Sequence, residues 1–211
     1  MTTPNQALID HQTRLRSCRR CPDVTGPPVL GEPAPSSILL VGQAPGDKEP
    51  VLARPFAWTA GKTLFKWFES IGLDEERFRQ RVYISAVCRC FPGKNPKGGD
   101  RVPSSKEIGT CAAWLEQEFE LLGPRLLIPV GKLAISRFVP VGRLVDVIGR
   151  QQRIEYRGAA VDMIPLPHPS GASTWHRTQP GESLLQAALE LIAQHPAWRE
   201  SLTDRAVQAA D

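Results

Sequence analysis

Five cysteines give the chain the donor types of a metal centre. Cys18 and Cys21 are separated by two residues in a polar, proline-terminated turn, and Cys88, Cys90 and Cys111 follow far along the chain. An odd cysteine count without an export signal argues against structural disulfides. Four thiolates suit zinc or an iron–sulfur cluster, and the alternative is a set of unrelated buried thiols. Strand alternation puts Cys88 and Cys90 on one side, so either could bind, and spacing alone does not choose the metal.

Acid–base or hydrogen-bonding chemistry would fall to His168, which stands between two prolines after an apolar run. The alternative is a structural or capping histidine, the commoner fate of an isolated one. Asp47 and Glu49 are carboxylates in the loop that follows another apolar run. They could act on a water molecule or serve only as surface charge.

Alternating strand and helix patterns must position these residues. Apolar runs predict strands at 37–42, 82–87 and 126–131, and a hairpin with limbs at 153–156 and 159–166. Helical patterns cover 3–16, 59–71, 105–122, 133–138 and 183–194, with Ser104 or Ser105 as a cap. Together they predict an α/β layer fold with a mainly parallel sheet. Such folds place their sites at the carboxyl ends of strands, so we expect the loops 42–47, 88–103 and 168–177 to converge there.

Composition bounds the class of protein. The 211 residues include 26 Lys and Arg against 22 Asp and Glu, and the pI of about 8.9 permits a nucleic-acid partner. Apolar runs are too short for a membrane span, and the first residues lack a secretory signal, so we expect a cytoplasmic monomer without membrane partners. We expect one domain at 1–196 and a frayed tail at 197–211.

Gly61-Lys62-Thr63 has the form of the end of a nucleotide phosphate loop. Such a loop requires a glycine five positions earlier, where this chain has Phe56. The preceding residues also do not end a strand. We therefore expect no nucleotide phosphate site here.

Taken together, the motifs resemble those of the iron–sulfur uracil-DNA glycosylases, often called family 4. The matching segments are Cys18-x-x-Cys21, residues 38–46, Arg54-Pro55-Phe56 with Ala60-Gly61, residues 82–90, Pro103 with Glu107 and Cys111, residues 128–131, and His168-Pro169-Ser170. They extend over about residues 15–192. Each motif is weak alone, but the ordered set is specific.

The resemblance implies a three-layer α/β/α sandwich with a central four-stranded, mainly parallel sheet. Cys18, Cys21, Cys90 and Cys111 would hold a structural 4Fe–4S cluster, with zinc as the alternative. The enzyme would flip uracil, or a related deaminated base, out of DNA and hydrolyse its bond to deoxyribose. Its partner would be DNA that contains such a base.

The resemblance also implies roles for single residues. Phe56 would stack on the flipped base, close to Gly42 and Ala44. His168 would donate a hydrogen bond to the base oxygen, because the departing base gains negative charge. Ser170 would begin a loop that presses into the minor groove. Phe56 as a core residue and Ser170 as a turn cap are the alternatives.

At two polar positions the chain departs from the family. Gln43 stands where the family has Glu and cannot act as a base, although its amide could orient a water or a base edge. Glu49 is then our favoured residue for activating water, ahead of Asp47. Ala86 stands where the family reads uracil with Asn, so either Asn95 substitutes or the specificity differs.

Two loops depart as well. Residues 91–103 form a longer segment with Lys94, Lys97 and Arg101, which could follow a DNA backbone or simply be solvated. After Ser170, Trp175 could act as a stacking wedge and Arg177 as a phosphate clamp.

The sequence therefore predicts a DNA glycosylase of base excision repair that uses a water nucleophile. A second hypothesis, motivated by Gln43 and Ala86, is a catalytically weakened iron–sulfur relative that binds DNA or senses damage. A third is a zinc-bearing nucleotide hydrolase of the same layer class.

Overall fold

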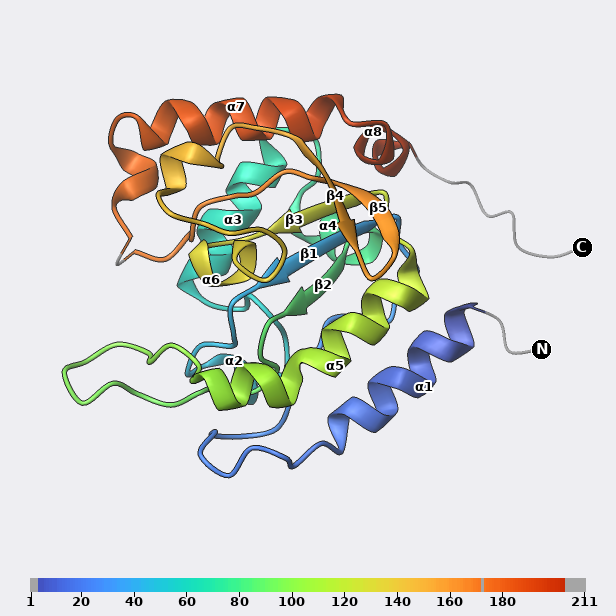
Figure 1. The fold of residues 1–211 in the computed structure, drawn as a ribbon, viewed down its shortest axis with the longest axis vertical. Coiled ribbons are helices and arrows are strands. Elements are labelled where there is room, and N and C mark those ends of the chain that lie inside the picture. The colour runs from blue at the N-terminus through green and yellow to red at the C-terminus, as the bar shows by residue number, and fades with distance from the viewer. Residues whose placement is uncertain (1–3, 172, 204–211) are drawn as a thin grey trace, which may run out of the picture.

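A five-stranded sheet forms the centre of the computed structural model, which describes residues 4–171 and 173–203 (Figure 1). The strand order is β2-β1-β3-β5-β4. The strands are β1 (Ile38–Gly42), β2 (Tyr83–Ala86), β3 (Leu126–Pro129), β4 (Gln152–Tyr156) and β5 (Ala159–Met163). Strands β2, β1, β3 and β5 are parallel, which confirms the expected parallel layer. The expected count of four is corrected to five, because the first limb of the hairpin joins the sheet as the antiparallel edge strand β4.

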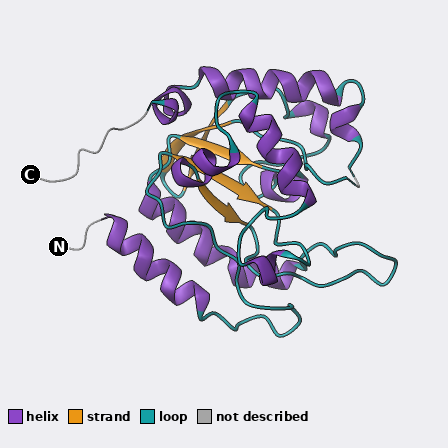
Figure 2. Ribbon diagram, turned by 180° about the vertical axis from the view of Figure 1, so that it is seen from behind, coloured by secondary structure: helices purple, strands orange, loops and turns teal. Residues whose placement is uncertain are grey.

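Helices cover both faces of the sheet and make three layers (Figures 1 and 2). One face carries α1 (Pro4–Arg16) and α5 (Ser105–Leu122), which pack over Leu39, Val41 and Leu127. The other carries α3 (Thr59–Glu69), α4 (Glu75–Arg81), α7 (Gly181–Gln194) and α8 (Pro196–Leu202). Two short helices, α2 (Glu49–Leu52) and α6 (Lys132–Ile135), complete the set, with 3-10 turns at Leu144–Asp146 and Trp175–Arg177. The sequence did not predict α2, α4 or α8.

Helix α5 begins at a fixed point, which matters because it carries Cys111. Ser104 caps the helix: its hydroxyl accepts the Glu107 N–H, and the Glu107 carboxylate accepts the Ser104 N–H. Arg101 also donates two hydrogen bonds to this carboxylate and lowers the pKa of Glu107 to about 2. The cap expected from the sequence is therefore present.

A buried polar network joins α1, α5 and β2 beneath the sheet. The fully buried Glu118 forms an ion pair with Arg89 and accepts hydrogen bonds from Tyr83 and Ser85, each at 2.8 Å. Nε2 of His11, on α1, lies 3.4 Å from the same carboxylate. Since an unpaired buried charge is costly, Arg89 and Glu118 hold each other in place.

The expectation of a frayed tail after residue 196 is wrong for the next residues, because 196–202 form α8. Trp198 is fully buried, with its ring 5.5 Å from that of Phe68 and 6.2 Å from that of Phe78. Its indole N–H donates to the Ile71 carbonyl at 3.1 Å. Residues 204–211 lie outside the described residues.

In the described part of the chain, no helix combines the length and apolar character of a membrane span.

We predict that Trp198→Ala lowers the free energy of unfolding by about 3–5 kcal/mol, because it leaves a cavity between α3, α4 and α8. Urea denaturation measures this. The matched control is Leu121→Ala on the surface of α5, where the side chain is 38% exposed and the expected change is within about 0.5 kcal/mol. Equal effects of the two substitutions would show that α8 is not part of the core.

Candidate functional site

The carboxyl ends of the parallel strands form one edge, where the candidate residues gather. Gly42 ends β1 and lies opposite Ala86 at the end of β2. Val130 continues β3 and pairs with Leu166, two residues before His168. The Val130 N–H also donates to the Val41 carbonyl, so the ends of β1 and β3 are side by side. The predicted site at this edge is thus built from adjoining strands.

Phe56 lies against the end of β1 in an unusual backbone conformation. Its φ of 54° is left-handed, which is strained for a bulky residue. A Cβ added to Gly42 would come 2.9 Å from the Phe56 ring, so only glycine leaves room for this contact. Phe56 N–H donates to Glu49 Oε2 at 3.0 Å, and the Phe56 carbonyl accepts from Arg79 at 3.3 Å. Glu49 and Arg79 therefore fix the backbone of Phe56, and the backbone in turn positions the ring.

Gly61 explains the segment that looked like a phosphate loop. A Cβ on Gly61 would come 1.7 Å from the Phe56 carbonyl oxygen, so the glycine is required by close packing. Gly61-Lys62-Thr63 lies inside α3 rather than in a strand-to-helix loop. The expectation of no nucleotide phosphate site is consistent with this geometry.

His168 is positioned as a hydrogen-bond donor. Its Nδ1 accepts the Ser170 N–H at 3.2 Å, so the proton of the neutral ring is on Nε2. Burial, with a smaller contribution from His176, lowers the pKa of His168 below its ordinary 6.5 and favours that neutral form. Gly131 has a φ of 87°, and a Cβ there would come 3.1 Å from His168 Cδ2. The hydrogen bond from Ser170 and the close contact with Gly131 after β3 together fix the orientation of the His168 imidazole.

A second imidazole, which the sequence analysis missed, anchors the 168–177 loop. His176 is buried edge-on against Trp67 of α3, with 5.2 Å between ring centroids. Its Nε2 accepts a hydrogen bond from Arg177 at 3.3 Å. Nothing in the local sequence distinguishes it from a surface histidine, since its burial depends on α3.

Trp175, the expected stacking wedge, packs partly against the core of the protein. It is half-buried against the core that includes α7, and a Cβ on Gly181 would come 1.9 Å from its carbonyl oxygen. In this structure Trp175 supports the loop, while Arg177 is exposed. Residue 172 of the same loop lies outside the described residues.

The two carboxylates of the β1 loop have different surroundings. Glu49 is buried, and burial raises its pKa to about 7, although the N–H groups of Phe56 and Gly46 oppose this by donating to it. Asp47 is half-buried and lies 3.0 Å from the Lys94 ammonium, whose hydrogen bond lowers the pKa of Asp47. Asp47 is thus ionised at neutral pH. The carboxyl group of Glu49, in contrast, is hydrogen-bonded to the backbone of Gly46 before it and of Phe56 after it.

The expected base-binding residues divide into two places. Gln43 and Ala44 are half-buried and continue directly from Gly42, while Ala86 is beside Gly42 in register. Asn95 is elsewhere: its N–H donates to the Gly99 carbonyl at 2.9 Å and its Oδ1 accepts the Lys97 N–H at 3.1 Å. The N–H and the Oδ1 of Asn95 are therefore both engaged within the turn at residues 95–99.

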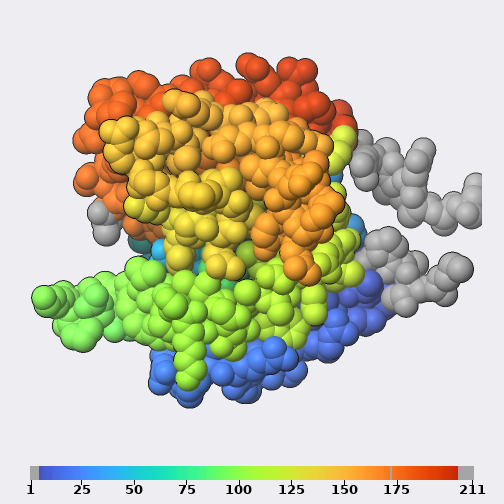
Figure 3. Space-filling model, in the orientation of Figure 1, coloured from blue at the N-terminus to red at the C-terminus, as the bar shows by residue number. Residues whose placement is uncertain are grey.

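Residues 91–103 form an arm that stands out from the surface beside α2 (Figures 1 and 3). At its base Lys94 pairs with Asp47 and with Asp100, at 3.0 and 2.8 Å. Arg101 is bound to Glu107. Two of the three basic side chains expected to follow DNA are therefore engaged in ion pairs that shape the arm.

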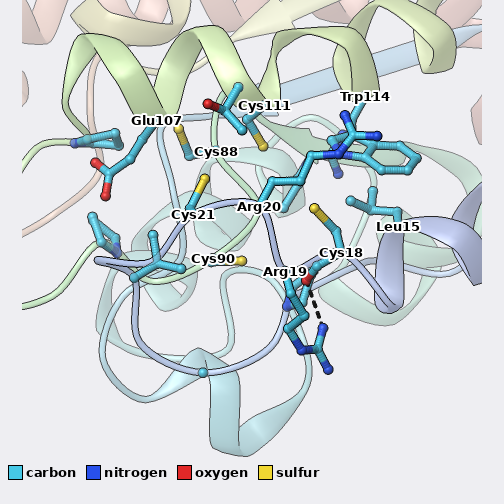
Figure 4. Close-up of a pocket in the computed structure, with 17 residues that line it drawn as sticks. Leu15, Cys18, Arg19, Arg20, Cys21, Cys88, Cys90, Glu107, Cys111 and Trp114 are labelled. Atoms are coloured by element: carbon cyan, nitrogen blue, oxygen red, sulfur yellow. Dashed lines mark hydrogen bonds between the residues drawn. The ribbon is translucent and has the colours of Figure 1, made fainter.

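All five cysteines line one cavity of about 120 Å³ (Figure 4). Cys18 and Cys21 come from the turn after α1, Cys88 and Cys90 from the segment after β2, and Cys111 from α5. Hydrogen bonds between residues 25 and 91 and between residues 29 and 89 hold two of these segments together. The structure thus places cysteines from three separate segments of the chain around one cavity.

The side chains that line this cavity include thiols, the donor type shared by zinc sites and iron–sulfur clusters. Among the described residues, no three His, Cys, Asp or Glu side chains converge closely enough to hold one metal ion. Zinc requires its sulfur ligands at about 2.3 Å from one point, whereas a cluster binds each thiolate to a different iron. The pKa of Cys111 is lowered to about 7, because Cys88 donates a hydrogen bond to it and the buried Arg89 lies nearby. Such a positive neighbour favours the thiolate form of Cys111, which binding to either kind of metal centre requires.

Residues 28–192 match the family model described as the uracil DNA glycosylase superfamily, which covers most of the chain. The chain belongs to this superfamily. The resemblance inferred from the ordered motifs is thereby confirmed. The α/β fold of this superfamily member agrees with that assignment.

Curated relatives agree with the family match. A type-4 uracil-DNA glycosylase of Archaeoglobus fulgidus is 29% identical, over 78% of this chain and 82% of the relative. One from Thermotoga maritima is 29% identical, over 81% and 85%. A type-5 uracil-DNA glycosylase of Pyrobaculum aerophilum is 28% identical, over 63% and 69%. This uracil DNA glycosylase superfamily member therefore has relatives of both types.

We predict a pH-dependent contribution of Glu49 to stability. Because its folded-state pKa of about 7 exceeds the ordinary 4.5, its contribution is present at low pH and is lost as the pH rises between these values. Between pH 5 and 8, the free energy of unfolding of the wild type should fall relative to that of Glu49→Gln by roughly 2–3 kcal/mol. Urea denaturation at both pH values measures this, and parallel profiles would contradict the assignment.

Proposed function

We propose that the chain is a DNA glycosylase that hydrolyses the N-glycosidic bond of uracil in DNA as a step of base excision repair. The observation that carries the proposal is the pairing of a fixed aromatic ring with a fixed donor. Phe56 lies against Gly42, and His168 lies against Gly131, at adjoining strand ends of a superfamily member. The names of the type-4 relatives support uracil as the base.

The target base would bind against Phe56 after leaving the helix stack, at a cost of a few kcal/mol. Gln43 follows Gly42 and carries the amide that can pair with a base edge. Ala86 beside it offers only a methyl group, so in this proposal base recognition rests on Gln43 and on backbone groups of the β1 loop.

His168 would stabilise the departing base. As the glycosidic bond breaks, the electron pair moves to uracil and the sugar becomes oxocarbenium-like. A neutral imidazole with its proton on Nε2 can donate a hydrogen bond to the uracil oxygen that gains this charge. Its hydrogen bond from Ser170 prevents the other tautomer.

The two carboxylates would divide the remaining work. Ionised Asp47 can accept a hydrogen bond from the attacking water. The oxygens of Glu49 instead accept hydrogen bonds from the backbone N–H groups of Phe56 and Gly46 and so hold those residues in place. We therefore move the water-orienting role from Glu49 to Asp47. Asp47→Asn should slow the chemical step, and it also removes the ion pair with Lys94 at the base of the 91–103 arm.

Cys18, Cys21, Cys90 and Cys111 would hold a 4Fe–4S cluster whose contribution is to cross-link three segments of chain. It would tie α1 to the segment after β2 and to α5. Reduced thiols for such a cluster suit the cytoplasm, where the enzyme would act as a monomer on DNA.

The test of the proposed function is single-turnover cleavage by anaerobically purified protein. Oligonucleotides carrying uracil, hypoxanthine or xanthine are incubated with enzyme and treated with alkali. Breakage at uracil is expected. Breakage only at another base would move the specificity, and tight binding of uracil DNA without breakage would favour the non-catalytic relative.

We predict that His168→Ala lowers the single-turnover rate by about 10²–10³-fold, because the base oxygen loses its donor. The matched control is His195→Asn, since His195 caps α8 with Nδ1 and Asn preserves a cap. The control should retain the wild-type rate. An unchanged rate in His168→Ala would remove His168 from the mechanism.

We predict that Cys18→Ala and Cys90→Ala lose most of the bound iron, whereas Cys88→Ala keeps it. Cys88 lines the same cavity and therefore controls for the loss of a buried thiol. Iron and acid-labile sulfide per protein measure this. Stoichiometric zinc in colourless protein would instead support the zinc alternative.

A further inference from the structure

We propose that the start of α3 is a platform for the DNA strand next to the target nucleotide. On it Trp58 stacks a neighbouring base, and Lys62 and Lys66 contact phosphates. The inference rests on the proposed function, because it takes Phe56 as the residue that receives the flipped base.

The exposure of Trp58 is the first observation. Its side chain is 50% exposed, whereas the other four tryptophans are buried or half-buried. Trp58 lies two residues after Phe56, so their Cα atoms are at most about 7 Å apart. A nucleotide adjoining the one on Phe56 is therefore within reach of the indole.

The backbone around Trp58 is held in place. Arg79 donates to the carbonyls of Pro55 and Phe56, at 2.8 and 3.3 Å. The Trp58 carbonyl accepts the Lys62 N–H at 3.1 Å, which sets the residue at the start of α3. The backbone that carries the indole thus has a fixed place relative to that of Phe56.

Charge complementarity identifies the occupant. Lys62 Nζ lies 6.0 Å from the centroid of the Trp58 ring. Trp58, Lys62 and Lys66 follow at intervals of four residues, a rise of about 6 Å each, so they share one face of the helix. Both lysines are exposed, and within the described residues neither forms an ion pair. An aromatic ring beside free cations is the chemistry that binds a single nucleic-acid strand.

The 91–103 arm fits this role less well. Lys94 is engaged with Asp47 and Asp100, and Arg101 with Glu107. A phosphate would have to compete with these carboxylates. On α3 the first turn carries no acidic residue.

Binding of a uracil-free, thymine-only single strand tests the platform without depending on excision. The readouts are fluorescence anisotropy of a labelled oligonucleotide and quenching of tryptophan fluorescence. Trp58→Ala should weaken binding about tenfold and Trp58→Phe much less, because phenylalanine still stacks. Lys62→Gln should reduce the slope of log Kd against log salt concentration by about 0.7.

The controls are Leu121→Ala and Lys106→Gln on α5, an exposed apolar and an exposed basic residue away from α3. Both should bind like the wild type, and thermal unfolding checks that every variant folds. Unchanged affinity in Trp58→Ala would overturn the inference. Unchanged affinity with an altered oligomeric state would overturn it in favour of a second copy of the chain.

The two proposals can fail separately. Trp58-dependent binding by protein that excises no base would keep the platform and remove the glycosylase activity. Excision of uracil with the same affinity and rate in Trp58→Ala would keep the activity and remove the platform.

Discussion

The left-handed backbone of Phe56 is the constraint on which the site depends. A bulky residue in this conformation costs on the order of 1–3 kcal/mol and persists only where its surroundings enforce it. Here Glu49 of α2 accepts its N–H, Arg79 of α4 donates to its carbonyl, and Gly61 of α3 packs against that carbonyl. Residues from three helices thus hold the backbone that carries the Phe56 ring. The ring is in place before any base arrives, so binding does not have to order it.

The parallel sheet supplies the rest of the site. Its topology brings the ends of β1, β2 and β3 to one edge. Gly42 at the end of β1 lies opposite Ala86 of β2, and on its other side the strand end that leads into Gly131 is hydrogen-bonded to β1. The cysteine cavity adjoins the same strands from the α5 side. The segment that leaves β2 after Ala86 carries Cys88 and Cys90, and Arg89 between them is paired with Glu118. A cluster in this cavity would therefore brace the strand that borders the site.

Sequence patterns predicted what depends on local periodicity. The strands, the cap at Ser104 and the strand-end position of His168 are of this kind, and the structure has them. Residues whose surroundings come from distant segments were harder. Trp198 stands in a polar stretch, and its burial depends on Phe68 and Phe78. Glu49 looked like a free carboxylate, because the closure of its loop around it leaves no periodic signal. Asn95 is used by its own turn, which a residue type alone cannot show.

The most direct test of the central claim, that Phe56 and His168 together hold uracil, is a crystal structure of the protein with bound uracil. We expect the base stacked against the Phe56 ring, with His168 Nε2 about 3 Å from a uracil oxygen. Uracil bound away from both residues would contradict it. So would a base on Phe56 with His168 Nε2 directed elsewhere, because the donor that stabilises the departing base would then be missing.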